Sequence, residues 1–97
     1  MKLSDSEIAA ALADLPFWSQ TTVGNVNALT RRVSFPTFPS LIAAVNQIAV
    51  AAEKANHHPD LDIRYTNLTI YLTSHDAGGI TPRDLKMAKQ ITAILPA

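Results

Sequence analysis

Three histidines, gathered at two polar junctions of the chain, are the residues best suited to do chemistry. His57 and His58 stand within Glu53–Pro59 (EKANHHP), and His75 stands within Ser74–Gly79 (SHDAGG). Imidazole has an ordinary pKa of ~6.5, so it can give and take protons near neutral pH. The chain has no cysteine and therefore no thiol chemistry to offer instead. We expect these histidines to transfer protons.

The elements around these histidines place each ring differently. His57 and His58 follow the C-terminal end of an expected helix, where unpaired carbonyls favour a cation. Pro59 ends that helix and holds His58 extended, so the two adjacent rings must point in different directions. Glu53 lies one helical turn before His57 and can bond to it or to a ligand. His75 is expected at the exit of the last strand, away from the core aliphatics, and the two glycines that follow allow a tight turn close to a small molecule.

Size and composition limit the possible classes of function. Ninety-seven residues with 47% hydrophobic content fit one domain, residues 1–97, with one core. Eight basic and eight acidic residues give zero net charge, so no overall field attracts nucleic acid or anionic lipid. No apolar run reaches the ~20 residues of a membrane-spanning helix. The first residues lack the apolar run of a signal peptide, so we expect a cytoplasmic protein.

The spacing of apolar residues predicts an α+β domain in the order helix-strand-strand-helix-strand-strand-helix. The expected elements are a first helix capped by Ser4 and stopped by Pro16, strands Phe17–Thr22 and Ala28–Phe35, a long helix capped by Thr37 and ending near Asn56, strands over residues 61–65 and 68–73, and a last helix capped by Thr81. Such an order favours a four-stranded antiparallel sheet with three helices on one face.

Short local signals predict the turns and the start of the last helix. Residues 23–25 (VGN) and 66–67 (TN) are expected to turn the two hairpins, because Gly and Asn tolerate positive φ. Pro82 suits the first helical position, and Asp84 can reach back to the cap as a capping-box acid. We therefore expect Asp84 to be a helix cap and not a catalyst.

At this point the residues match a known pattern. The spacing E-x3-H-H-P-x5-Y-x9-H-x8-D resembles the signature of the pterin-4a-carbinolamine dehydratases; it is made by Glu53, His57, His58, Pro59, Tyr65, His75 and Asp84. Weaker resemblance covers the rest of the chain, in Leu15–Trp18, Leu29–Arg32 and Phe35–Pro39. Leu61 departs from the family, in which an aromatic residue is common at this position. The departure puts in doubt a contact that flanks the ligand or packs nearby, and it does not concern the histidines. Phe17, where a glycine is common, is a smaller departure.

The resemblance implies dehydration of a 4a-hydroxytetrahydropterin, such as 4a-hydroxytetrahydrobiopterin, to the quinonoid dihydropterin, with no metal or cofactor. By analogy His57 and His75 act as acids at the hydroxyl, His58 does acid/base work on the ring and Glu53 orients; these roles could be permuted. Backbone groups of residues 74–77 are expected to bond the pyrimidine edge. The implied substrate-binding residues are Glu53, His57, His58, Pro59, Ser74, His75, Asp76, Ala77 and Trp18. Proteins of this family are usually dimers or tetramers, so we expect a homodimer or homotetramer.

Other interpretations of the same residues remain open. Three histidines can bind zinc, but an adjacent pair in extended chain cannot easily aim both rings at one ion, and no H-x3-H or C-x2-C spacing is present, so no metal is expected. Trp18 and Tyr65 can also be core or interface aromatics. The two arginines at residues 31–32 are more typical of a solvated strand than of a binding patch.

A rival function is a non-catalytic oligomerising module that acts as a partner of a transcription regulator, with no direct contact to nucleic acid and none to a membrane. Such an adaptor has no need for Glu53 and three histidines together. Their joint presence favours the enzyme.

Overall fold

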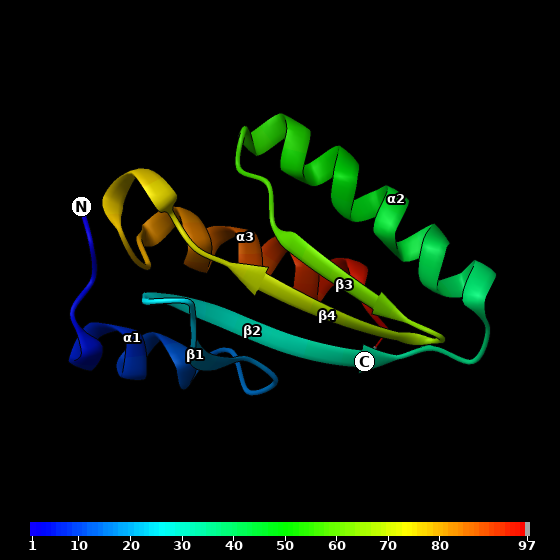
Figure 1. The fold of residues 1–97 in the computed structure, drawn as a ribbon, viewed down its shortest axis with the longest axis horizontal. Coiled ribbons are helices and arrows are strands. Elements are labelled where there is room, and N and C mark those ends of the chain that lie inside the picture. The colour runs from blue at the N-terminus through cyan, green and yellow to red at the C-terminus, as the bar shows by residue number, and fades with distance from the viewer. Residues whose placement is uncertain (97) are drawn as a thin grey trace.

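A four-stranded antiparallel sheet with three helices on one face forms the protein in the computed structural model, which describes residues 1–96 (Figure 1). The elements are α1 (Asp5–Leu12), β1 (Ser19–Val23), β2 (Val26–Ser34), α2 (Phe38–Ala55), β3 (Asp60–Arg64), β4 (Asn67–Leu72), a 3-10 turn η1 (His75–Ala77) and α3 (Pro82–Ile94). The strand order is β1-β2-β4-β3, so β2 and β4 are central. The predicted fold class and element order are confirmed.

Each helix begins where a capping box satisfies its first backbone N–H groups. The hydroxyl of the cap residue accepts a hydrogen bond from a backbone N–H two or three residues later. The side chain of the third residue after the cap accepts in return from the backbone N–H of the cap residue. The three pairs are Ser4 with Glu7, Thr37 with Ser40, and Thr81 with Asp84. All three predicted caps are therefore confirmed, and the cap of α3 places Asp84 in a buried position.

The two hairpins have two-residue turns, one of them earlier than expected. Val23 pairs with Val26, so Gly24, with φ 63°, and the following asparagine make the first turn. In the second hairpin Arg64 pairs with Asn67, so the turn lies one residue before the predicted position. Asn67 belongs to β4 instead, where its side chain accepts a 2.6 Å hydrogen bond from the Ser34 hydroxyl on β2. That cross-strand bond favours pairing of Asn67 over its use in the turn.

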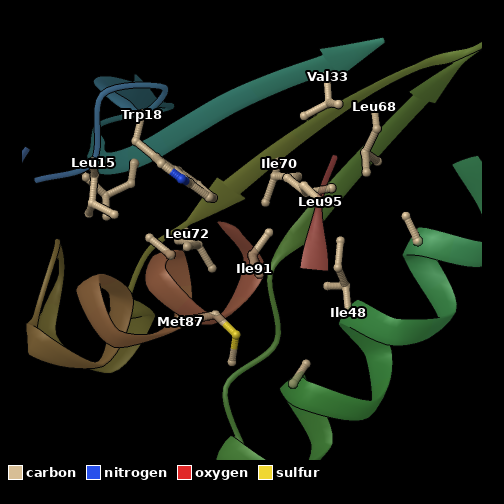
Figure 2. Packing of buried hydrophobic residues seen from close by; sticks show 14 of the residues in the cluster. Leu15, Trp18, Val33, Ile48, Leu68, Ile70, Leu72, Met87, Ile91 and Leu95 are labelled. Carbon is tan, nitrogen blue, oxygen red and sulfur yellow. The ribbon is translucent and has the colours of Figure 1, made fainter. Parts of the chain in front are cut away.

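The core lies between the sheet and the two long helices. Figure 2 shows side chains of α2 and α3 facing those of the central strand β4: Ile48, Met87 and Ile91 lie opposite Leu68, Ile70 and Leu72. These six side chains are buried, and burying one of this size contributes roughly 1.5–3 kcal/mol. Among residues 1–96, no helix combines the length and apolar content needed to cross a bilayer.

One charged residue, Arg31, lies on the core face of β2. Its register opposite Ile70 puts it on the same face as Leu29, and it is buried, whereas the neighbouring Arg32 is exposed. The guanidinium lies 4.9 Å from the centre of the Phe17 ring, and burial lowers the pKa of Arg31. The expectation of a solvated pair is therefore wrong for the first of the two arginines.

The same substitution on a central and on an edge strand tests this arrangement. Ile70→Ala removes a side chain that is 0% exposed and should lower the free energy of unfolding by about 2–5 kcal/mol, because it leaves a cavity in the core. Ile63→Ala on β3, where the side chain is 38% exposed, should cost less than half as much. Urea denaturation of both variants measures the difference, and equal losses would contradict the described packing.

Candidate active site

A buried histidine–aspartate pair joins the end of α2 to the start of α3. His57 Nε2 lies 2.5 Å from Asp84 Oδ1, and the two side chains are 10% and 0% exposed. A carboxylate only accepts hydrogen bonds. His57 therefore donates from Nε2, and in the neutral ring its other nitrogen, Nδ1, is an acceptor.

The end of α2 determines where the His57 ring lies. Asn56 adopts the left-handed conformation, with φ 51°, and the His57 N–H donates to the Ala52 carbonyl at 3.1 Å. This six-residue bond across a left-handed residue is the Schellman arrangement that commonly ends helices. It turns the chain sharply away from the helix axis. His57 is thereby directed toward α3 rather than continuing the exposed face of α2.

Asp84 is the centre of a buried hydrogen-bond network. Its Oδ2 accepts from the Thr81 backbone N–H and from the Ser74 hydroxyl, each at 2.9 Å. Ser74 in turn lies 2.8 Å from the Thr81 hydroxyl, which donates to it because the Ser74 proton is already committed to Asp84. One carboxylate therefore caps α3, binds the residue before His75 and holds His57. The network joins the loop that carries His75 to the helix end that carries His57.

His58 forms a second histidine–carboxylate pair, with Glu53, which was expected to bond to His57 or to a ligand. His58 Nε2 lies 2.9 Å from Glu53 Oε2, and the two side chains are 60% and 80% exposed. Glu53 does not pair with His57 as predicted, because the turn at Asn56 directs His57 toward α3. Because the His58–Glu53 pair is exposed to solvent, it contributes little to the stability of the fold. Its consequence is orientation of the His58 ring.

The loop after β4 is held by its own backbone. The Ser74 N–H donates to the Gly79 carbonyl at 2.8 Å, and the Ser74 carbonyl accepts from the N–H groups of Ala77, Gly78 and Gly79. Gly78 has φ 72°, a conformation that glycine adopts without strain. The backbone groups of Ser74 are thus occupied within the loop, and the exposed His75 is carried at its outer edge.

Asp76 and Arg83 form an ion pair between this loop and α3. Arg83 donates to Asp76 Oδ1 at 2.6 Å. This hydrogen bond lowers the pKa of Asp76 below its ordinary value. The Asp76 side chain, predicted to bind substrate, is therefore already engaged with a neighbour. Ala77 is half-buried beside it.

His57 and His58 line two separate hollows. The first, of about 260 Å³, lies between α2 and α3 and is lined by Lys54, Ala55, His57, Arg83, Lys86, Met87 and Gln90. The second, of about 200 Å³, lies between α2 and β3 and is lined by Ile48, Ala49, Ala52, Glu53, His58, Pro59 and Leu61. The second hollow brings together three predicted binding residues, and neither hollow is lined by His75.

Trp18 is placed in the hydrophobic core and not in either hollow. It is buried, and its indole N–H donates to the Thr92 hydroxyl on α3 at 2.9 Å. Buried tryptophans usually find such a partner. Of the two roles left open for Trp18, this environment fits the core aromatic. Tyr65, at the turn between β3 and β4, is exposed.

Sequence reasoning found Asp84 as a cap but missed its bond to His57, and it missed the buried Ser74 side chain. The spacing of the signature included Asp84, which was the one available signal. No signal marked the Ser74 hydroxyl, because its partner is supplied only when the loop and α3 meet. Within residues 1–96, no three His, Cys, Asp or Glu side chains come together as a metal-binding group.

Comparison with known proteins gives the family. The model of the family described as pterin 4 alpha carbinolamine dehydratase matches residues 1–94. The chain belongs to this family. Two relatives whose names assign them provisionally to the pterin-4-alpha-carbinolamine dehydratases come from Nocardia farcinica and Mycolicibacterium smegmatis. The first is 47% identical over 89 residues, which cover 92% of this chain and 90% of the relative. The second is 46% identical over 93 residues, which cover 96% and 95%.

Solved structures share the fold of this dehydratase-family chain. A Brucella melitensis protein described as a transcriptional coactivator/pterin dehydratase superposes with a TM-score of 0.89 at 33% identity, covering 99% of this chain and 100% of that one. A pterin dehydratase-like protein described as a RuBisCO assembly factor in the alpha-carboxysome has a TM-score of 0.66 at 18% identity, covering 79% and 87%. At that identity the second shows a common fold alone.

Replacing the buried carboxylate by an amide tests the His57 pair. In Asp84→Asn the amide oxygen can still accept from Thr81 and Ser74, but its NH2 group then faces His57, so Nε2 must become an acceptor. We expect neutral His57 to change from the Nε2–H to the Nδ1–H tautomer in long-range ¹H–¹⁵N NMR spectra. The free energy of unfolding should fall by about 1.5–3 kcal/mol with loss of the charged partner.

Asp62→Asn is the matched control, because Asp62 is partly exposed and, within residues 1–96, its side chain bonds only to Arg64, at 3.3 Å. It should change the free energy of unfolding by no more than about 0.5 kcal/mol and leave the His57 spectrum as in the parent. Retention of the Nε2–H form in Asp84→Asn would show that the carboxylate does not set the tautomer.

Proposed function

We propose that this chain is a dehydratase that converts a 4a-hydroxytetrahydropterin into the quinonoid dihydropterin and water, in tetrahydropterin recycling. Membership of the pterin-4a-carbinolamine dehydratase family supports the reaction class. The buried pair of His57 and Asp84 is the single observation that carries the proposal. A carboxylate beside a histidine fixes the tautomer and the orientation of the ring, as suits a proton-transferring group.

The reaction requires two proton transfers at neighbouring atoms. The bond between C4a and the hydroxyl oxygen breaks as that oxygen gains a proton and leaves as water. The N5–H bond gives its proton to a base, and its electron pair forms the C4a=N5 double bond. One proton is supplied and one is removed, so the balance is the loss of one water. A positioned histidine contributes ~10²- to 10⁴-fold to each such transfer.

Both paired histidines are suited to these transfers. In His57 and in His58 a carboxylate engages Nε2, which leaves Nδ1 free of that carboxylate and able to exchange a proton with a substrate. We assign His57 and the exposed His75 to the hydroxyl and His58 to N5, with Glu53 as the residue that orients His58. Since neither described hollow is lined by more than one of these rings, this assignment requires the substrate to lie across the surface between the hollows. Asp84 is a positioning residue, since it acts through His57. The ring that protonates the hydroxyl can later recover its proton from solvent.

Substrate contacts follow from the same placement. Pro59 and Leu61 line the hollow beside His58 and offer apolar surface to a flat ring. The backbone of His75, Asp76 and Ala77 is proposed to bond the pyrimidine edge, since the backbone of Ser74 is engaged within its loop. Leu61 offers an aliphatic contact where the family commonly has an aromatic ring.

Single histidine substitutions test the reaction. His58→Ala and His75→Ala should each slow dehydration by about 10²-fold or more and leave the fold intact, because both side chains are exposed. The assay measures accumulation of the 4a-adduct beside a phenylalanine hydroxylase, with and without this protein. Arg32→Ala, at an exposed position of β2, is the control and should match the parent. Parent rates in both histidine variants would refute these roles.

A second candidate is an oligomerising or interaction module, and one feature favours it. A hollow of about 560 Å³ between α2 and α3 is lined largely by apolar side chains, among them Val50, Ala51, Ala93 and Ile94. Val50 is exposed there. A helix face of this kind is typical of contact between subunits or with a partner helix.

Placing a charge on this face separates the two candidates. Val50→Glu should reduce the assembly size in light scattering, because a charged, hydrated side chain would replace an apolar contact, while dihydropterin binding persists. Asn46→Glu, one turn earlier on α2 and outside the hollow, is the control. An unchanged assembly size in Val50→Glu would exclude this face as the contact.

A further inference from the structure

The hollow between α2 and α3 beside His57 carries a concentration of positive charge that the dehydration chemistry does not use. We propose that this hollow binds an anionic group, a phosphate or carboxylate, carried by the substituent of the pterin. The inference rests on the proposed function, because it names the class of pterin that the site prefers. It makes three residues, Lys54, Arg83 and Lys86, determinants of specificity.

The three cations come from two helices and face one space. Lys54 lies in the last turn of α2, and Arg83 and Lys86 lie one turn apart on α3. All three line the hollow of about 260 Å³, together with the amide of Gln90. Pockets that enclose a whole small molecule usually measure ~300–1,000 Å³. This hollow therefore suits one group of a larger ligand.

The charge of this hollow is not balanced by its own walls. No Asp or Glu lines it, and in the described part of the chain neither lysine forms an ion pair with a carboxylate. The chain as a whole has eight basic and eight acidic residues, so the excess is local. Cations one turn apart on a helix repel each other. A bound anion would relieve that repulsion.

Arg83 is held in place by a partner outside the hollow. One of its NH2 groups donates to Asp76 at 2.6 Å. A guanidinium has five N–H donors in a rigid fork, so others remain for an anion after this pair forms. The Asp84 carboxylate behind the hollow is fully buried and committed to His57, Ser74 and Thr81. It is therefore not free to form a direct ion pair with the arginine or with the two lysines.

The place of His57 connects this hollow to the reaction. His57 lines the same hollow as the three cations, so an anionic group bound there lies within one short substituent of the catalytic ring. A pterin with a neutral hydroxyalkyl substituent leaves the lysines without a partner. The geometry thus favours the anionic member of any pair of pterins that share the same ring.

The experiment compares 7,8-dihydroneopterin with its monophosphate, which differ only by the phosphate. Fluorescence titration at low salt should show binding of the monophosphate at least tenfold tighter, as charge-assisted hydrogen bonds imply. In the double variant Lys54→Gln/Lys86→Gln the ratio of the two affinities should fall close to one. Lys89→Gln, an exposed lysine of α3 that does not line the hollow, should keep the parent ratio.

The outcomes separate this inference from the proposed function. A parent ratio within a factor of two, or a large ratio that survives in the double variant, would overturn the anion site while dehydration could persist. Tight monophosphate binding without dehydration of any 4a-hydroxypterin would leave the anion site standing and refute the reaction. Dihydrofolate, whose substituent ends in carboxylates, identifies the anion: preference for it over the monophosphate assigns a carboxylate.

Inorganic phosphate provides the readout if neither dihydropterin binds. Phosphate should then shift the His57 NMR signals in the parent protein and in Lys89→Gln, and should fail to shift them in Lys54→Gln/Lys86→Gln. No shift in the parent at a phosphate concentration of tens of millimolar would overturn the anion site.

Discussion

A buried carboxylate, Asp84, is the interaction on which the arrangement of the site depends. An ionised carboxylate away from water is costly unless hydrogen-bond donors surround it. Here the donors are the Thr81 N–H at the start of α3, the Ser74 hydroxyl at the end of β4 and the His57 ring at the end of α2. Three segments distant in sequence are drawn to one group. The residue that caps α3 therefore also positions the His57 ring.

The sheet and the helices make this convergence possible by their order. β4 is central and buries Leu68, Ile70 and Leu72 against α2 and α3, so the ends of both helices lie near the end of that strand. The apolar contacts stabilise the fold, and the polar network uses the position that they provide. Burial of apolar side chains therefore holds whole helix faces against the sheet, whereas the hydrogen bonds fix the positions of a few side chains.

Charge is distributed unevenly over a chain that is neutral overall. Cations gather around the hollow beside His57, whereas the hollow beside His58 contains Glu53 and apolar side chains. Adjacent histidines are thus given opposite surroundings by a single left-handed residue between them and the helix. The basic hollow is formed by two lysines and one arginine of α2 and α3.

The sequence by itself determined the fold class, through the period of its apolar residues, and the three helix caps, through their capping boxes. It also marked the three histidines as candidate site residues, through a signature of fixed intervals. All of these depend on local spacing. It could not place Asn67 in β4 or Arg31 in the core, since a bond to Ser34 and a register across the sheet decided those positions. Nor could it pair Asp84 with His57 and Glu53 with His58. Partners 27 residues apart meet only when α2 and α3 pack, and which carboxylate each ring takes depends on the direction in which Asn56 turns the chain.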